Sequence, residues 1–295
     1  MRVILAGGSG FLGRALGARL SADGHTVQVL TRHPRPGVAT DLGWRADGSG
    51  GDWVAVLDGA DAVVNLAGAG IADKRWTAAR KQALLESRLQ PTASLVAAIR
   101  QARMPPVLVS SSAVGYYGPR GDERIPEDTP PADDFLARLC REWEAAALQA
   151  AGVTRVALLR TGLVLDPRGG ALGSMLLPFK LGVGGRLGSG EQYWPWIHIA
   201  DWLEMTTWII GEARAAGPFN LTAPEPVTNA RFTRALGQAL HRPAVLPAPT
   251  FALRLALGEF ARFLVTGQRA VPDHAESLGF EFRFRDVEGA LGDLL

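Results

Sequence analysis

Short apolar runs alternate with longer amphipathic stretches along the first two thirds of the chain. Residues 2–6 and 26–31 are short apolar runs, which is typical of parallel strands buried on both faces. Between them, residues 11–22 repeat apolar positions at helical spacing, and Asp23-Gly24 marks the end of this helix. This order predicts a first strand–helix–strand unit.

The same alternation continues through residue 165. Further strands are predicted at residues 62–67, 107–111 and 155–165, and helices at residues 75–103 and 133–150. Pro91 lies inside the first of these helices and predicts a break or kink at the preceding residue. Together these elements predict an α/β fold with a doubly wound parallel Rossmann sheet.

The pattern becomes looser after residue 165. Many glycines surround an apolar helix predicted at residues 172–181, and further helices are expected at residues 201–212, 229–240 and 251–264. Asp201 has the position of an N-cap for the helix that it begins. A smaller, substrate-side region is therefore expected beyond residue 165.

A proline-rich stretch at residues 243–249 is interpreted as a domain boundary. We expect a dinucleotide-binding domain over residues 1–242, with its substrate-side elements mainly from residue 166 onward. Residues 243–295 are expected to form a short C-terminal domain.

Composition and charge narrow the class of protein. The 295 residues carry a net charge of only +2, without a basic tract interleaved with aromatic residues, so we expect no nucleic-acid partner. The single cysteine, Cys140, excludes an internal disulfide, and no metal-ligand spacing occurs, so we expect no metal. Without a signal peptide or an apolar run of about 18 residues, a cytoplasmic protein with no membrane contact is expected.

A glycine motif connects the first predicted strand to the first predicted helix. Gly7, Gly10 and Gly13 have the spacing Gly-x-x-Gly-x-x-Gly. Glycines permit a turn with positive φ, close approach of the backbone to a pyrophosphate, and close packing of helix on strand. The helix N-terminus offers free N–H groups to phosphates. We predict a dinucleotide site formed by the following residues of this loop: Gly7, Ser9, Gly10, Phe11 and Leu12.

The end of the second strand distinguishes two dinucleotides. An acidic residue there would bind the ribose 2′-hydroxyl of NAD(H), whereas an arginine accommodates the 2′-phosphate of NADP(H). The strand ends in Thr31 and Arg32, without an acid. These two residues predict NADP(H), with a solvent-exposed arginine at a strand end as the alternative interpretation.

A second contact region follows another strand at the same edge of the sheet. Leu66, Ala67 and Gly68 come directly after Asn65 and are predicted near the adenosine ribose and the pyrophosphate. A plain strand-to-loop turn is the alternative.

Motifs across nearly the whole chain resemble one superfamily. The glycine motif, Asn65-Leu66-Ala67-Gly68 and residues 110–118 are similar to the extended short-chain dehydrogenase/reductases. Further motifs resemble its NADP-dependent epimerase branch, whose members carry a short C-terminal domain of unknown function. They are Ser87-Arg88, Arg160-Thr161-Gly162, residues 194–201 and Gly267-Gln268-Arg269. The resemblance implies a Rossmann fold, bound NADP(H) and a small polar substrate such as a nucleotide sugar.

The resemblance also implies a catalytic Ser, Tyr and Lys, of which this chain keeps only the first. Ser112 has the serine position, with Ser111 as the alternate and as a predicted cofactor contact. In the superfamily, Tyr and Lys lie one helical turn apart, and the lysine lowers the pKa of the phenol. The matching positions hold Leu136 and Cys140 instead.

Other side chains are candidates for the missing roles. Tyr116 and Tyr117 are candidate acid/base groups, with packing at a strand end as the alternative. Arg88 is predicted to bind the nicotinamide-side ribose, or a carboxylate or phosphate of the substrate, with a plain exposed arginine as the alternative. Four residues are predicted to line a substrate pocket, although packing is the preferred role of the last: Arg160, Gln192, Trp194 and His198.

Two functions stay open from the sequence. The first is an NADP(H)-binding, epimerase-like oxidoreductase that acts on a small polar substrate without the Tyr-x-x-x-Lys pair. The second is a non-catalytic sensor or scaffold that holds NADP(H), which the missing pair favours. A homodimer is expected, because the superfamily often pairs two long helices.

Overall fold

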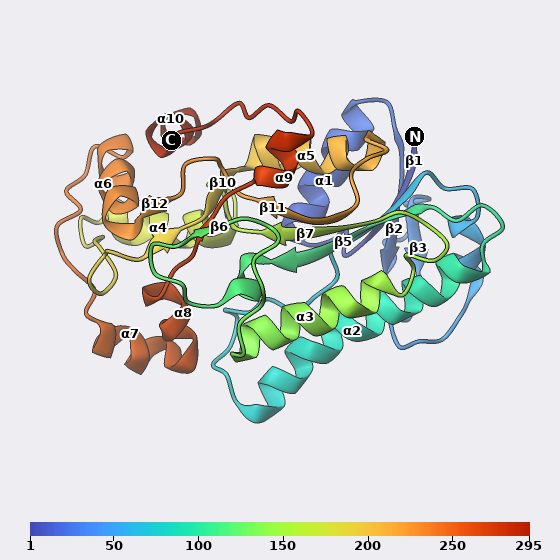
Figure 1. Cartoon of the computed structure of the whole chain (residues 1–295), viewed down its shortest axis with the longest axis horizontal. Coiled ribbons are helices and arrows are strands. Elements are labelled where there is room, and N and C mark those ends of the chain that lie inside the picture. Colours follow the sequence, from blue (N-terminus) through green and yellow to red (C-terminus); the bar gives the residue numbers. More distant parts are fainter.

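A seven-stranded parallel sheet forms the centre of the computed structural model, which covers all 295 residues (Figure 1). Its strands, in spatial order, are β11 (Gly217–Leu221), β7 (Val156–Thr161), β5 (Val107–Ala113), β4 (Ala62–Asn65), β1 (Arg2–Ala6), β2 (Thr26–Thr31) and β3 (Asp41–Gly43). All neighbouring pairs are parallel. The predicted doubly wound α/β fold is confirmed.

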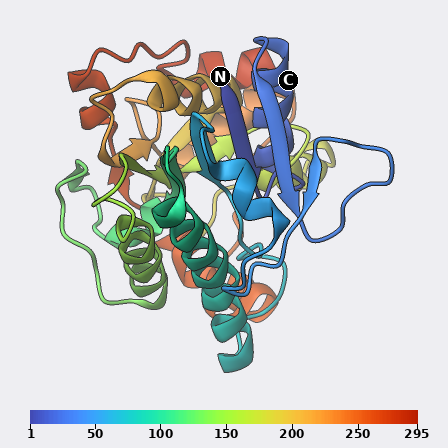
Figure 2. The ribbon, with the colours of Figure 1, turned by 90° about the vertical axis from the view of Figure 1, so that its right-hand side faces the viewer.

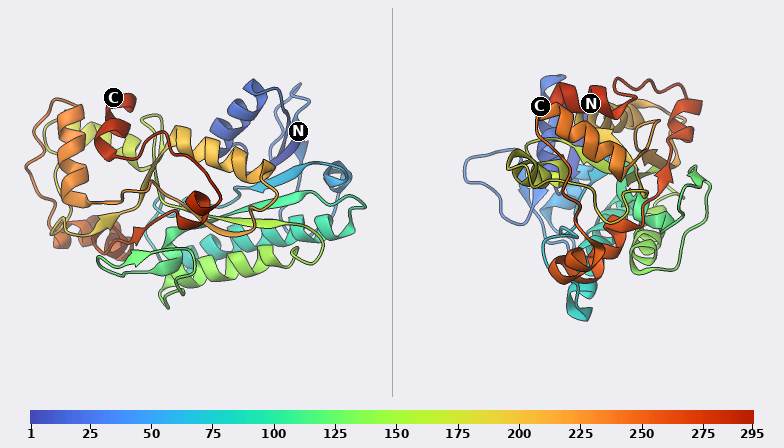
Figure 3. Two further views of the ribbon diagram at one scale, coloured as in Figure 1. Left: turned by 45° about the horizontal axis from the view of Figure 1, so that its top comes forward. Right: turned by 90° about the vertical axis from the view of Figure 1, so that its left-hand side faces the viewer.

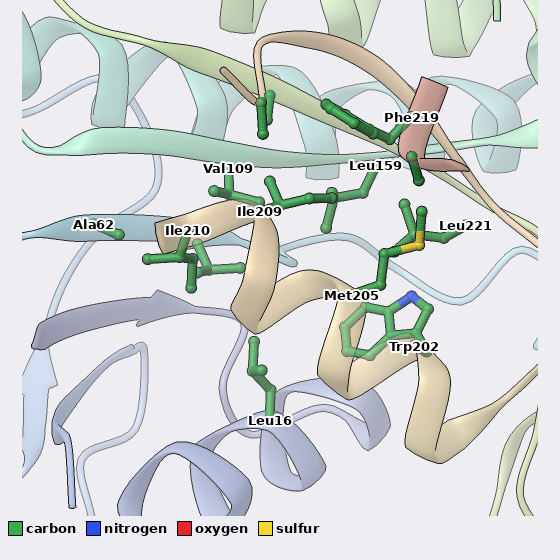
Figure 4. Packing of buried hydrophobic residues seen from close by; sticks show 14 of the residues in the cluster. Leu16, Ala62, Val109, Leu159, Trp202, Met205, Ile209, Ile210, Phe219 and Leu221 are labelled. Atoms are coloured by element: carbon green, nitrogen blue, oxygen red, sulfur yellow. The ribbon is translucent and has the colours of Figure 1, made fainter. Parts of the chain in front are cut away.

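Two helices cover each face of this sheet. α1 (Phe11–Ala22) and α5 (Ile199–Gly211) lie on one face, and α2 (Ala78–Gln101) and α3 (Phe135–Leu148) lie side by side on the other (Figures 1 and 2). Figure 4 shows α5 between the sheet and α1, with a row of buried apolar side chains along it. This packing holds the carboxyl edge of the strands in place.

Pro91 does not interrupt α2, contrary to the prediction from the sequence. The helix runs unbroken past it, and Pro91 is buried. Pro91 lacks the N–H that would bond the Ser87 carbonyl, so the helix loses one internal hydrogen bond there. Pro91 and its neighbours Thr92 and Leu95 are buried, and this packing outweighs the loss.

The single strand predicted at residues 155–165 is two strands, β7 and β8 (Leu163–Leu165). They separate at Gly162, where an added Cβ would lie 2.2 Å from the Pro195 carbonyl oxygen. β8 leaves the main sheet and pairs with β10 (Trp196–His198). The split directs the chain into the smaller lobe on the left of Figure 1.

The smaller lobe has its own apolar cluster. Its elements are α4 (Gly170–Lys180), β9 (Tyr193–Trp194), β12 (Val227–Thr228), α6 (Asn229–Ala239), α7 (Thr250–Leu257) and α8 (Ala261–Val265). Three short 3-10 helices also occur: η1 (Asp52–Leu57), η2 (Val114–Tyr117) and η3 (Gly258–Phe260), which connects α7 to α8 in the smaller lobe. None of the helices has the length and apolar character that a membrane crossing requires.

The C-terminal segment, residues 269–295, runs back past the large sheet before it ends in the smaller lobe (Figure 3). β13 (Arg269–Ala270) pairs with β6 (Arg124–Ile125), and α9 (Asp273–Ser277) packs on β11. Phe280 and Phe282 belong to the same buried cluster as Phe219 of β11. α10 (Val287–Leu294) joins the cluster of the smaller lobe. The C-terminal segment therefore shares its core with both parts of the molecule.

Candidate functional site

The loop between β1 and α1 forms one wall of a pocket at the carboxyl edge of the sheet. Gly7 has a φ of +79°, and an added Cβ would lie 2.6 Å from the Leu66 carbonyl carbon. A Cβ on Gly13 would lie 2.4 Å from the Gly7 carbonyl oxygen. These two positions therefore require glycine, one for the turn and one for the close packing of α1 on it.

The first turn of α1 faces this pocket without a side-chain cap. Gly10 is the N-cap residue and offers no side-chain hydrogen bond, and the first turn holds no acidic residue. The free N–H groups at a helix N-terminus, together with the helix dipole, favour an anion. The geometry suits a phosphate group.

The pocket has a volume of about 620 Å³. Eight of the residues predicted from the sequence line it: Gly7, Ser9, Gly10, Thr31, Arg32, Leu66, Ala67 and Gly68. Phe11 and Leu12 instead pack, partly buried, against the core of the sheet. Ser111 lies on β5, one strand beyond β4, and is half-buried.

Further residues that the sequence did not single out also line the pocket, among them Trp44, Arg45 and Asp47. Arg45 adds a second guanidinium to the lining that holds Arg32, Asp47 adds one carboxylate, and Trp44 forms an apolar wall that packs edge-on against Trp53. Trp44 and Arg45 follow β3, a three-residue strand too short to show a periodic pattern. The one sign of this part of the pocket in the sequence was Arg45 itself, an arginine that follows the second predicted strand by about a dozen residues.

Arg88 lies behind the pocket and not on its surface. Its guanidinium donates to the backbone carbonyls of Leu84 and Ala69, at 3.0 and 3.1 Å, and lies 5.1 Å from the ring centre of Trp143. Nε is buried without a hydrogen-bond partner, and burial lowers the pKa of the side chain. Arg88 therefore supports the turn at Gly68. A Cβ added to Gly68 would lie only 3.2 Å from the guanidinium carbon of Arg88.

A buried polar network occupies the place of the predicted catalytic serine. Ser112 Oγ donates to Glu144 Oε1 at 2.6 Å, and the same carboxylate accepts two bonds from Arg160, each 2.8 Å long. All three side chains are buried. Arg160, predicted to line a substrate pocket, is instead committed to an internal ion pair, and the Ser112 hydroxyl donates to the same carboxylate.

The two candidate phenols also belong to this network. Tyr117 is fully buried; its hydroxyl donates to Asn220 Oδ1 at 2.7 Å and accepts from Arg160 at 2.9 Å. Burial raises the pKa of the Tyr117 phenol above its ordinary value. The Tyr116 ring lies 3.6 Å from the Arg160 guanidinium carbon. Tyr117 is therefore held as a structural group, and Tyr116 stacks on a cation.

The helix face that carries Tyr and Lys in the superfamily is apolar in this chain. Leu136 and Cys140 are both buried in one cluster with Trp143. Leu136 packs against Gly115: a Cβ added to Gly115 would lie 3.3 Å from the Cβ of Leu136. No proton-transferring side chain lies on this face of α3 beside Ser112, apart from Glu144, which the ion pair with Arg160 occupies.

The predicted substrate residues do not all face one space. Trp194 is buried and packs against Phe232, with ring centres 5.2 Å apart. Gln192 Nε2 donates to the carbonyls of Leu187 and Leu264, whereas its Oε1 is buried without a partner. Gln192 thus keeps a buried oxygen without a partner, whereas Nε2 of His198 lies 3.3 Å from the Asp293 carboxylate.

His198 caps α5, a role that the sequence analysis assigned to Asp201. Nδ1 of His198 accepts from the Ala200 N–H at 3.0 Å, and its ring stacks on Phe284 at 3.8 Å. Asp201 instead accepts the N–H groups of Arg283 and Phe284, each at 2.9 Å. The N-cap assignment of Asp201 was wrong, because its partners come from the distant C-terminal segment.

Comparison with known proteins connects this geometry to a family. Residues 3–222 match the model of the NAD dependent epimerase/dehydratase family, and residues 248–294 match a domain of unknown function (DUF1731). An epimerase family protein of Mycobacterium bovis is 45% identical over 293 residues, which are 98% of this chain and 96% of the relative. One from Bacillus subtilis is 37% identical over 302 residues, which are 100% of this chain and 98% of the relative.

A solved structure is similar along the whole chain. The crystal structure of the human epimerase family protein SDR39U1, with NADPH, has a TM-score of 0.93 and 38% identity, and the match covers 100% and 99% of the two chains. A UDP-galactose 4-epimerase has a TM-score of 0.73 at 18% identity, covering 100% and 97%, which shows a shared fold.

Proposed function

Since this chain belongs to the NAD-dependent epimerase/dehydratase family, we propose that it binds NADP(H) in the pocket between the β1–α1 loop and β3. The single observation that carries this proposal is the pocket itself. It joins an uncapped helix N-terminus, which suits the pyrophosphate, to an end lined by Arg32, Arg45 and the Asp47 carboxylate, where the Arg32 guanidinium suits the 2′-phosphate. The NADPH-bound human relative supports the choice of dinucleotide.

Arg32 is the residue that distinguishes the two cofactors in this proposal. It is exposed, lines the pocket and takes part in no ion pair, so its charge is available to a phosphate. The Arg32→Ala variant should weaken NADPH binding by about tenfold or more, while NADH affinity changes little. Titration of tryptophan fluorescence with each cofactor measures both.

Arg138→Ala is the matched control, because Arg138 is also exposed and unpaired but lies on α3, outside the pocket. Equal weakening of NADPH and NADH in Arg32→Ala would contradict the assignment of the 2′-phosphate to Arg32.

We further propose that the protein is an epimerase-like oxidoreductase for a small polar substrate, a nucleotide sugar included, which works without a Tyr-x-x-x-Lys pair. The family supports this reading. The test is incubation with NADPH or NADP+ and a panel of ketones, aldehydes, alcohols and nucleotide sugars. Absorbance at the nicotinamide band and product analysis report turnover.

A second candidate, a sensor or scaffold that holds NADP(H) without turnover, has a specific observation in its favour. The hydroxyl groups of Ser112 and Tyr117 donate to Glu144 and Asn220, inside the protein. Leu136 and Cys140 stand where the superfamily has its acid/base pair of Tyr and Lys. Tight NADPH binding with no turnover across the whole panel would favour this candidate over the first.

A further inference from the structure

A second pocket is lined by residues of α6 and the loop that follows it. Figure 1 shows α6 at the opposite end of the molecule from β1, β2 and β3. Its volume is about 830 Å³. Ala230 and Gly237 on α6 and Ala244 beyond it contribute small side chains to its lining. An added Cβ on Gly237 would lie 2.8 Å from Ala244 Cβ, so helix and loop are in close contact there. Four basic side chains also line it, Arg186, Arg234, His241 and Arg242, together with Thr233, Gln238, Pro243 and Val245.

These basic side chains have no acidic counterpart. No carboxylate lines the pocket, and the sequence has no Asp or Glu between Asp166 and Glu191 or between Glu225 and Glu259. The structure contains 16 ion pairs, none of which includes an arginine of this pocket. Unpaired like charges around one concavity create a positive potential that attracts an anion.

Most N–H groups of the three guanidinium groups are also free of protein acceptors. Arg234 makes no side-chain hydrogen bond. Arg186 donates one bond, from Nη1 to the Ser189 carbonyl at 3.3 Å, and Arg242 donates one, from Nε to the Lys180 carbonyl at 3.3 Å. The remaining donors are available to a ligand with several acceptor oxygens, and phosphate is the group whose geometry guanidinium recognises best.

His241 is held on the rim in an unfavourable backbone conformation. Its φ is +52°, and it is the one non-glycine residue of the chain with a positive φ. It occupies the left-handed position of a Schellman end to α6: its N–H donates to the Gln238 carbonyl, and the Arg242 N–H donates to the Gly237 carbonyl. Glycine is the usual residue there, so the imidazole is kept at a cost in stability.

Apolar surface continues directly from the basic rim. Val245 lines the pocket and is 75% exposed, and Leu246 beside it is 52% exposed. From this combination we propose that the pocket binds an organic phosphate ester with an apolar substituent. The phosphate lies among Arg186, Arg234 and Arg242, with the His241 imidazole beside it on the rim, and the apolar part lies on Val245. This site is independent of the proposed cofactor site.

Calorimetric titration of the full-length protein tests the proposal. The probes are monomeric dihexanoyl phosphatidic acid, inorganic phosphate, and the zwitterionic dihexanoyl phosphatidylcholine. Wild type should bind phosphatidic acid, and Arg234→Gln should weaken that binding about tenfold, because it removes one charge without breaking a bond within the protein. Arg138→Gln, with the same change of charge outside the pocket, should bind like wild type.

The His241→Gly variant separates the ligand from the fold. Glycine relieves the left-handed strain, so the melting temperature should rise while phosphatidic acid affinity falls. Tighter binding of phosphatidic acid than of inorganic phosphate supports the proposal. Inorganic phosphate that binds as tightly, with the same dependence on Arg234, would overturn the apolar substituent. No binding of either phosphate, equal binding of phosphatidylcholine, or equal weakening by Arg138→Gln would overturn the proposal.

Discussion

At the scale of single residues, the thiol of Cys140 is buried between α3 and β5. It is 1% exposed, and burial, with the nearby Glu144 carboxylate, raises its pKa to about 12. Thiol reagents react with the thiolate, so native protein should not be modified at pH 8 within the time that modifies denatured protein. Counting thiols with a chromogenic disulfide reagent, with and without guanidinium chloride, measures this. Rapid modification of the native protein would contradict the buried position.

His198 gives the stability a dependence on mildly acidic pH. Burial lowers the pKa of the His198 imidazole, and Nδ1 must stay unprotonated to accept the Ala200 N–H. The unfolded chain therefore binds this proton at a higher pH than the folded one, at about 6.5. The contribution of His198 is present above that pH and is lost as the pH falls through it.

The His198→Asn variant tests this dependence, because asparagine is also a good N-cap but does not titrate. The free energy of unfolding, measured in urea at pH 7.5 and pH 5.5, should fall less on acidification in the variant than in wild type. An identical fall in both proteins would count against a titrating cap at His198.

The role of a single residue could be predicted from the sequence only where residues next to it along the chain determine that role. Gly7, Thr31 and Arg32 are adjacent to the elements that define their role, so their place in the pocket could be predicted. The roles of Ser112 and Tyr117 could not, because Glu144 and Asn220 reach them from 32 and 103 residues away. A buried carboxylate between Ser112 and Arg160 leaves no local pattern in the sequence.

At the scale of elements, Asp201 fastens α5 to the C-terminal segment. Both carboxylate oxygens accept backbone N–H groups, from Arg283 and Phe284, and the side chain is buried. Asp201→Asn keeps one acceptor oxygen and loses the other and the charge, so it should lower the free energy of unfolding by about 1–3 kcal/mol. Urea denaturation measures the change.

Asp133→Asn is the control, because the Asp133 carboxylate is fully exposed, and it should change stability little. An equal loss of stability in this control would show that the lost charge, and not the lost hydrogen bond, destabilises Asp201→Asn.

Helices and strands were predicted best where periodicity was long. Residues 11–22 and 26–31 have the bounds of α1 and β2, because several consecutive positions repeat the same environment. β3 was missed because three residues cannot show a period, and the break between β7 and β8 was missed because it depends on the distant Pro195 carbonyl. Short elements are fixed by tertiary contacts that the local pattern does not contain.

At the scale of the whole molecule, the C-terminal segment completes two cores. Phe280 and Phe282 pack in the core of the large sheet, and Val287 and Leu291 pack in the smaller lobe. Burial of each such side chain contributes about 1.5–3 kcal/mol. Together the four side chains contribute about as much free energy as the 5–15 kcal/mol by which a folded protein is typically stable. Truncation after residue 272 should therefore abolish the single cooperative transition of thermal unfolding. Differential scanning calorimetry checks this, and a truncated protein that melts as sharply and as high as the full chain would contradict it.

The bare N-terminus of α1 has a consequence for the life of the protein in a cell. Gly10 leaves the first-turn N–H groups without a side-chain acceptor, so a bound pyrophosphate would supply part of what the fold itself does not. A ligand that binds only the folded state adds about 2.7 kcal/mol of stability at a hundredfold excess over its Kd. Degradation acts on the unfolded fraction. The abundance of this protein should then rise and fall with the total cellular supply of NADP(H).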